Sequence, residues 1–325
     1  MPSQPTREGR RELRPHLPEI RQRGDPAGVK DSRQGSDAAR SGRGLPNHPL
    51  LDQALDLLGQ RTPLATGHFL QAPPRDPWQP DRDDRVLHVF ECIRFESLRQ
   101  DAPFEKAIAV DPKFAAAYAF LSYIHATEVC LGLSSSPGQS LERAFELAQQ
   151  AIALNDSLAD AHSALAFVYL LRRRHTEAIA AGERAVALNP GGADVTATLA
   201  ATLQYSGRPE ESFGLMKNAM RLSPVYPSWY LSVLGRGYVM TGRYEEALVA
   251  SDRWRDLTPD SPWPYWMMAL ADAGLNREVE ARAAMAHFLR LEPRMTLERW
   301  AKLAPYKNPA DLERVLDLAR KAGLK

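Results

Sequence analysis

The chain has 325 residues, of which 44% are apolar and 25% charged, and its formal net charge is +1. This balance is typical of a soluble globular protein and excludes binding to nucleic acid through bulk positive charge. No stretch approaches the roughly 18 consecutive apolar residues of a membrane span, and the first residues lack the apolar core of a secretory signal, so we expect no membrane association. The two cysteines, Cys92 and Cys130, are too few for a disulfide framework, which favours a reducing, cytoplasmic setting.

Residues 1–96 differ in composition from the rest of the chain. Residues 1–80 are rich in Pro and Gly and lack sustained apolar periodicity, which predicts a disordered, low-complexity segment. A local exception is HPLLDQALDLLGQ at 48–60, whose leucines have helical spacing and predict a short amphipathic helix ended by Gly59. The mixed charge of residues 1–50, without aromatic residues, is more typical of a solvated linker than of a nucleic-acid-binding arm. A shifted reading frame remains an alternative interpretation.

From about residue 97 onward, one short motif recurs at nearly constant spacing. The copies are AIAVDP, AIALND, AVALNP, AMRLSP and FLRLEP, and each ends a helix with a large apolar residue, a polar residue and usually Pro. Their last residues are Pro112, Asp156, Pro190, Pro224 and Pro293, and from Asp156 onward the period is 34 or 35 residues, with Pro259 at the intervening position. Two helices in 34 residues are typical of the tetratricopeptide repeat. The pattern predicts an all-α, right-handed superhelix of about four to five repeats over residues 97–293.

Small residues recur at one place in the first helix of successive periods. Ala166, Ala200 and Gly235 hold this place, and they would let paired helices approach closely while larger side chains fill the space between neighbouring repeats. A single unit of this kind cannot bury a core, so at least about three must stack.

The first repeat is longer than the others, because 44 residues separate Pro112 from Asp156. We assign the ten extra residues, LGLSSSPGQS, to a loop between helices at about 114–131 and 140–154. Residues after the last repeat, 294–325, predict two capping helices. The second of them is capped by Asn308 and ended by Gly323.

Several segments resemble a known family more closely than a generic repeat would. They are the run from SLERAFELAQQ to AVALNP, the phrase GRPEES, the WYL segment at 229–231 and the ending PYKNPADLERVLDLARKAGL. Over about residues 104–325 they resemble the C-terminal tetratricopeptide region of bacterial class III adenylate and guanylate cyclases and of related transcriptional regulators. The resemblance implies a regulatory region that follows a cyclase or a winged-helix domain.

Neither of those domains is predicted in this chain. Residues 1–96 are too short and too poor in strand pattern for a cyclase fold, which would need metal-binding aspartates on paired strands. Asp81, Asp83 and Asp84 are adjacent in a loop, so no catalytic role is transferred to them. The segment before Pro112 also lacks the clean amphipathic pattern expected of the first helix of a repeat.

Motifs for catalysis or cofactor binding are absent from the sequence. No HExxH, Walker A, Rossmann glycine or GxSxG pattern occurs. His88 and Cys92 lie four residues apart, but two ligands do not make a zinc site. His125 and His162 occupy places that we expect to face the core. We therefore expect no enzyme activity, no metal and no cofactor.

The concave groove formed by the first helices is the expected binding surface. For the three tryptophans predicted to lie in the groove, packing in the core is an equally weighted alternative. Among the predicted groove residues, only Arg236 has the type of side chain that binds the acidic tails of chaperones. The predicted groove residues are Tyr123, Asp160, Phe167, Asp194, Gln204, Trp229, Arg236, Trp263 and Trp266.

Two hypotheses about function follow. The first is a non-catalytic scaffold that binds a peptide or partner protein in the groove, with its oligomeric state left open. The alternative is the detached regulatory region of a cyclase or transcriptional regulator involved in signalling.

Overall fold

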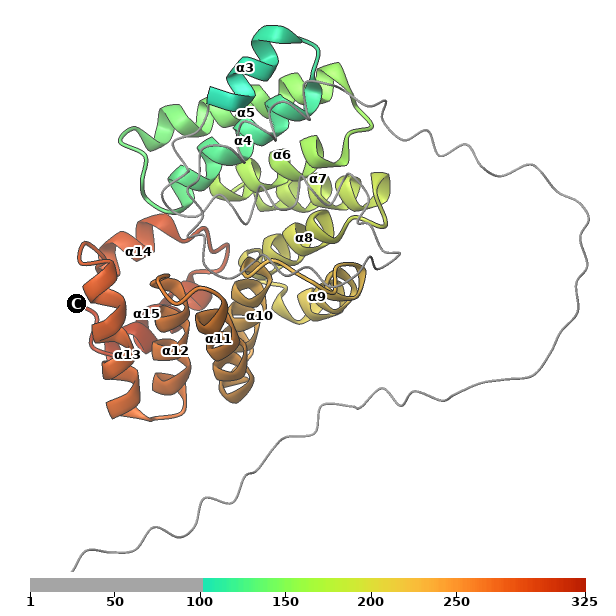
Figure 1. Ribbon diagram of the computed structural model, residues 1–325. Coiled ribbons are helices and arrows are strands. Elements are labelled where there is room, and N and C mark those ends of the chain that lie inside the picture. The colour runs from blue at the N-terminus through green and yellow to red at the C-terminus, as the bar shows by residue number, and fades with distance from the viewer. Residues whose placement is uncertain (1–101) are drawn as a thin grey trace, which may run out of the picture. The chain divides into compact units, whose positions relative to one another are not determined.

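The computed structural model describes residues 102–325, with side chains from Phe104 onward, and in this range every regular element is a helix (Figure 1). None of these helices has the length and apolar character needed to cross a membrane. The predicted helix at 48–60, the pair His88 and Cys92 and the boundary at residue 96 lie outside the described residues. The helices are α3 (Ala102–Val110), α4 (Ala115–Cys130), α5 (Pro137–Leu154), α6 (Ala159–Leu171), α7 (His175–Leu188), α8 (Ala193–Tyr205), α9 (Pro209–Leu222), α10 (Trp229–Met240), α11 (Tyr244–Leu257), α12 (Trp263–Gly274), α13 (Glu278–Leu291), α14 (Leu297–Leu303) and α15 (Pro309–Lys321).

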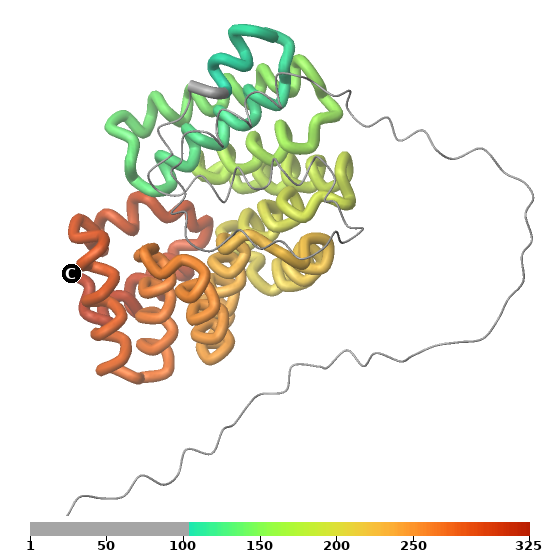
Figure 2. Tube along the Cα trace, viewed as in Figure 1, coloured from blue at the N-terminus to red at the C-terminus, as the bar shows by residue number. Residues whose placement is uncertain are grey.

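The helices pair in chain order as α4 with α5, α6 with α7, α8 with α9, α10 with α11 and α12 with α13. Each first helix also packs against the first helix of the next pair, so the pairs stack in succession, as the continuous change of colour in Figure 2 shows. This arrangement confirms the predicted all-α solenoid. Helix α3 precedes the first pair and packs on α4.

Small residues lie at the close contacts between repeats, as predicted. Ala166 and Ala200 are fully buried. A Cβ atom on Gly235 would lie 3.0 Å from Cγ of Met267 on the next first helix, which is tighter than ordinary van der Waals contact. The solenoid therefore depends on small side chains at this repeated position.

A left-handed residue forms the turn inside every helix pair. These residues have φ values between 58° and 81°, a region that costs most L-residues about 1 kcal/mol. Glycine avoids this cost, but two of the five turns use a larger residue. The turn residues are Gly132, Arg173, Gly207, Gly242 and Asn276.

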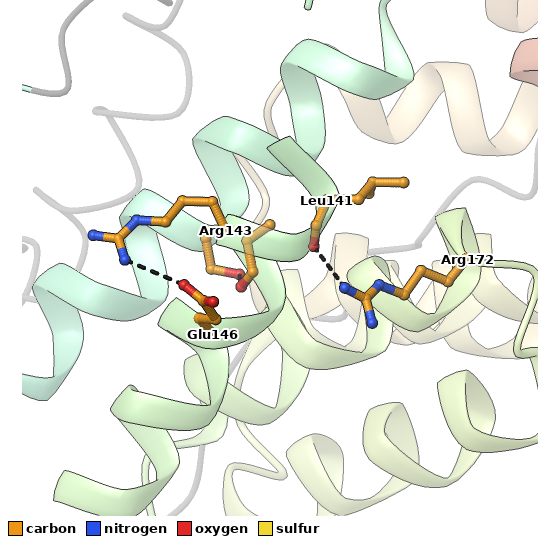
Figure 3. Close-up of polar contacts among 6 residues, drawn as sticks. Leu141, Arg143, Glu146 and Arg172 are labelled. Carbon is orange, nitrogen blue, oxygen red and sulfur yellow. Dashed lines mark hydrogen bonds and ion pairs between the residues drawn. The ribbon is translucent and has the colours of Figure 1, made fainter. Parts of the chain in front are cut away.

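The ten extra residues of the first repeat do not all form a loop. Helix α4 has 16 residues and α5 has 18, against 13 and 14 for α6 and α7, so much of the insertion is additional helix. Pro137 at the first turn of α5 starts that helix earlier than the predicted residue 140. The extended α5 is tied to α6, because Arg172 donates to the carbonyl of Leu141 at 3.2 Å (Figure 3). Arg172 also donates to the carboxylate of Glu142 at 2.6 Å.

The prediction that His125 and His162 face the core was wrong. Both are partly exposed. Nδ1 of His125 lies 3.6 Å from the carboxylate of Glu128, and Nε2 of His162 lies 2.9 Å from the carbonyl oxygen of Asp156. The neighbouring residues are the buried ones, namely Ile124 and Ala126 beside His125, and Ala161 and Ser163 beside His162.

Residues 297–314, which we call the C-terminal strap, cross the turns of the first four helix pairs. Arg299 donates to the carbonyl of Gly132 at 2.8 Å, and the backbone N–H of Lys307 donates to the carbonyl of Tyr205 at 2.8 Å. Arg173 donates to the carbonyl oxygens of the strap, and Arg314 donates to the carbonyl of Met240 at 2.7 Å. The strap therefore lies along the carboxyl ends of the first helices, and Figure 1 shows α14 beside the turn between α4 and α5.

Capping side chains begin both helices of the strap. The side chain of Thr296 accepts a hydrogen bond from the backbone of Arg299, and that of Asn308 accepts one from Ala310 at 3.1 Å. Gly323, with φ of 100°, follows the end of α15. The predicted caps of the last helix are thus observed.

His175 at the start of α7 lies close to the strap and is only 7% exposed. Burial is the main cause that lowers its pKa below 6.5, and the charges of Lys307 and Arg173 lower the pKa further. Its Nδ1 lies 3.3 Å from Oγ of Ser206. The fold therefore favours the neutral imidazole.

We predict that Gly132→Ala destabilises the protein more than Gly242→Ala does. Both substitutions place a side chain in the left-handed region, at a cost of about 1 kcal/mol. A Cβ atom at Gly242 would meet nothing within 4 Å, whereas one at Gly132 would lie 2.6 Å from Nη2 of Arg299. Urea unfolding followed by circular dichroism measures both free energies, and equal losses would contradict the role given to Arg299.

We also predict that His175 contributes to acid sensitivity. Because its pKa is lower in the folded state, its full stabilisation is present above pH 6.5 and is lost as the pH falls below that value. The variant His175→Gln should lose less stability than the unsubstituted protein between pH 7 and about pH 5. Thermal unfolding at a series of pH values measures this difference, and parallel pH profiles would exclude it.

Candidate functional site

A cavity of about 360 Å³ opens on the face formed by the first helices. Residues spaced three or four apart on α4, α6, α8 and α10 line it, because that spacing places them on one face of each helix. Of the nine residues predicted for the groove, six line the cavity. They are Tyr123, Asp160, Phe167, Asp194, Trp229 and Arg236.

Aromatic side chains form much of the cavity wall. The rings of Tyr123 and Phe167 stack at 6.0 Å, and the rings of Phe104 and Phe120 stack at 5.3 Å. Burial raises the pKa of the Tyr123 hydroxyl, which lies 2.5 Å from Oγ of Ser163. Tyr123 is therefore a neutral phenol at physiological pH.

Two carboxylates lie at the amino ends of adjacent first helices. Asp160 and Asp194 each stand in the first turn of their helix, where the helix dipole favours a negative charge. The hydroxyl of Tyr230 donates to Asp194 at 2.8 Å. Burial, followed by the charge of Asp194, raises the pKa of Tyr230. One edge of the groove is consequently acidic.

Arg236, near the carboxyl end of α10, lies at the opposite edge. Its Nε donates to Oε1 of Gln204 at 3.0 Å, and its Nη1 donates to the hydroxyl of Tyr205 at 2.5 Å. The guanidinium also stacks on the ring of Tyr205, with its carbon 4.4 Å from the ring centroid. Three contacts thus fix the position of the only arginine that lines the described cavity.

Cys130 lines the cavity close to Arg236 and is a free thiol. Burial raises its pKa, and the charge of Arg236 opposes that shift to a smaller extent. The thiol is therefore protonated near neutral pH, which is unfavourable for a nucleophile.

Gln204 does not face the cavity. Its side chain is fully buried, and its Nε2 donates to the carbonyl of Val233 at 2.8 Å and to Ser212 at 3.0 Å. A Cβ atom on Gly237 would lie 2.6 Å from that nitrogen, so glycine makes the space for the amide. Gln204 therefore positions Arg236. It does not face the groove, contrary to the prediction from its place in the repeat.

Trp263 and Trp266 do not line the cavity either, and their packing matches the core alternative that the sequence left open. Trp266 is 2% exposed, and its ring centroid lies 4.7 Å from that of Trp300 on α14 and 5.2 Å from that of Phe288. Trp263 packs against the same two rings. The returning strap covers α12, and the groove ends at α10.

The sequence analysis missed several lining residues that follow the same spacing. Ser163 and Leu170 extend the series of Asp160 and Phe167 on α6, and Tyr205 extends the series on α8. Applying the spacing of three or four residues to each whole first helix would have found them. Phe104 had no such signal, because it lies on α3. Among the described residues no three His, Cys, Asp or Glu side chains form a group suited to a metal ion.

Comparison with solved structures shows the class of the fold. The chain is similar to a chain of the APC/C hetero-tetramer Cut9–Hcn1, with 15% identity, a TM-score of 0.55, and coverage of 74% of this chain and 42% of that one. It also matches TTC0263, a thermophilic TPR protein in Thermus thermophilus, with 20% identity and a TM-score of 0.44 over 61% of this chain and 98% of that chain. PilF of Pseudomonas aeruginosa matches with 21% identity and a TM-score of 0.44 over 61% of this chain and 88% of that chain.

The chain is thus an α-helical repeat protein. Its paired helices and 34-residue period give it the tetratricopeptide-repeat fold. No family model and no curated protein matches the chain.

We predict that Gln204→Leu disturbs Arg236 and destabilises the protein by about 1–3 kcal/mol, because buried partners of the amide lose their hydrogen bonds. Ser212→Ala removes a single neutral partner and should cost less. Chemical unfolding measures both changes, and the NMR signal of the Arg236 Nε–H reports its release. An unchanged signal in Gln204→Leu would contradict the positioning role.

Proposed function

We propose that this protein is a non-catalytic scaffold that binds an extended segment of a partner protein in the concave groove. The observation that carries the proposal is that four successive first helices line one and the same cavity. A partner lying across those helices would contact several repeats at once, which is how solenoids present an extended binding surface.

The chemistry of the cavity supports binding of apolar side chains. Phe167 and Trp229 are partly exposed at its wall, and aromatic residues in such pockets concentrate binding energy. Arg236 and the aspartates at the opposite edge would orient the partner by charge.

The absence of enzyme activity is part of the proposal. The lining thiol of Cys130 is held in its protonated form by burial, and no histidine lines the described cavity to act as its base. We further propose a cytoplasmic location, in which this thiol would remain reduced. The resemblance to cyclase-linked regulatory regions receives no support from the comparisons.

The proposal predicts that Trp229→Ala weakens binding of partner peptides. Removal of a central aromatic contact should cost about 30-fold in affinity, as for other hot-spot residues. An array of peptides probed with the full chain identifies binders, and fluorescence anisotropy then gives their dissociation constants.

Val279→Ala on α13 is the matched control, because Val279 is 79% exposed and lies outside the cavity. Circular dichroism must show the same helix content in both variants. Equal affinities of Trp229→Ala and Val279→Ala would place binding outside the groove.

A further inference from the structure

Arg236 carries a charge that the described residues do not neutralise. Its two hydrogen-bond acceptors, the amide oxygen of Gln204 and the hydroxyl of Tyr205, are both neutral. None of the ion pairs among the described residues includes it. A guanidinium has five N–H donors, so these two contacts leave donors for an anion.

The position of this guanidinium is fixed before any ligand arrives. The carbonyl of Val233 can only accept, so the amide nitrogen of Gln204 must face it and the amide oxygen must face Arg236. The ring of Tyr205 supports the guanidinium from one face. An anion that binds here would gain a charge-assisted hydrogen bond without ordering the arginine.

The cavity next to Arg236 presents mainly hydrocarbon. Phe120, Ile124, Phe167, Leu170 and Val233 line it. Three of the nearby hydroxyls already have partners within the fold. The hydroxyl of Thr202 donates to the carbonyl of Thr198, that of Ser232 donates to the carbonyl of Trp229, and that of Ser163 bonds to Tyr123.

The Arg236 end of the groove is bordered by the C-terminal strap. The ring of Tyr306 packs on that of Tyr205 at 5.0 Å, and Lys307 binds the backbone of Tyr205. A long chain that continues past Arg236 would meet this strap, whereas a short ligand that ends in a carboxylate would not. The volume of about 360 Å³ is within the range of small-molecule sites.

The acidic edge sets the direction of such a ligand. Asp160 and Asp194 stand in the first turns of α6 and α8, whereas Arg236 lies in the second half of α10. Arg236 is the only cationic side chain that lines the described cavity. The charges favour a monocarboxylate with an apolar body.

We propose that the cavity binds a small apolar monocarboxylate, with the carboxylate on the guanidinium of Arg236 and the hydrocarbon body among the aromatic and aliphatic side chains of α4, α6 and α8. This site goes beyond the proposed scaffold function, because its ligand is a small molecule and its recognition depends on Arg236.

Isothermal titration of the full chain with octanoate and decanoate, each compared with its primary amide, tests the site. The acids should bind at least about tenfold more tightly than the amides, since a hydrogen bond to a charged group is worth about 1.5 kcal/mol or more. Arg236→Gln should remove this preference while leaving the affinity for the amides within about twofold, and Arg236→Lys should restore part of it. Arg208→Gln, at an exposed ion pair with Glu211, is the matched control and should change nothing.

Three results of the titrations would overturn the proposal. They are equal affinity for acids and amides, no binding of either at millimolar concentration, and a preference for acids that persists in Arg236→Gln. Binding of peptides with a free C-terminal carboxylate, without binding of the small acids, would also overturn it and assign Arg236 to a protein terminus. None of these results decides the scaffold proposal, which is tested separately by the affinity of Trp229→Ala for partner peptides.

Discussion

The close approach of successive first helices is the constraint on which the rest of the structure depends. Ala166, Ala200 and Gly235 lie at these contacts, and a Cβ atom at Gly235 would already crowd Met267. Because the first helices pack against one another in succession, they present a shared face, and a cavity opens on it. The cavity with Arg236 is a consequence of this backbone geometry, which brings side chains from four helices together.

The strap determines where the groove ends, and the repeat pattern alone does not predict this end. Trp300 covers Trp266, so the fifth first helix contributes to the core and no longer to the groove. The strap also borders the edge where Arg236 lies, whereas the edge with Asp160 and Asp194 is formed by helix amino ends. The two edges of the groove therefore differ in both charge and enclosure.

The periodic part of the fold could be predicted from the sequence, because local spacing determines it. Pro190, Pro224 and Pro293 mark helix ends, and Asn308 marks a helix start, through interactions within a few residues. The groove positions of Asp160, Phe167 and Arg236 followed from the same register. The burial of Trp266 did not, since it depends on a helix more than 30 residues later. The inward position of Gln204 depends equally on the missing side chain of Gly237.

The contacts of the strap also affect how this solenoid would fold. In an open repeat array each unit contacts only its neighbours, so contact order is low and end repeats can unfold independently. Here the hydrogen bond from Arg299 to Gly132 joins residues 167 positions apart, and those from Arg173 span 128 to 133 positions. Separating the first repeat from the stack therefore requires breaking contacts formed by the last helices, which links the two ends of the described region in a single cooperative unit.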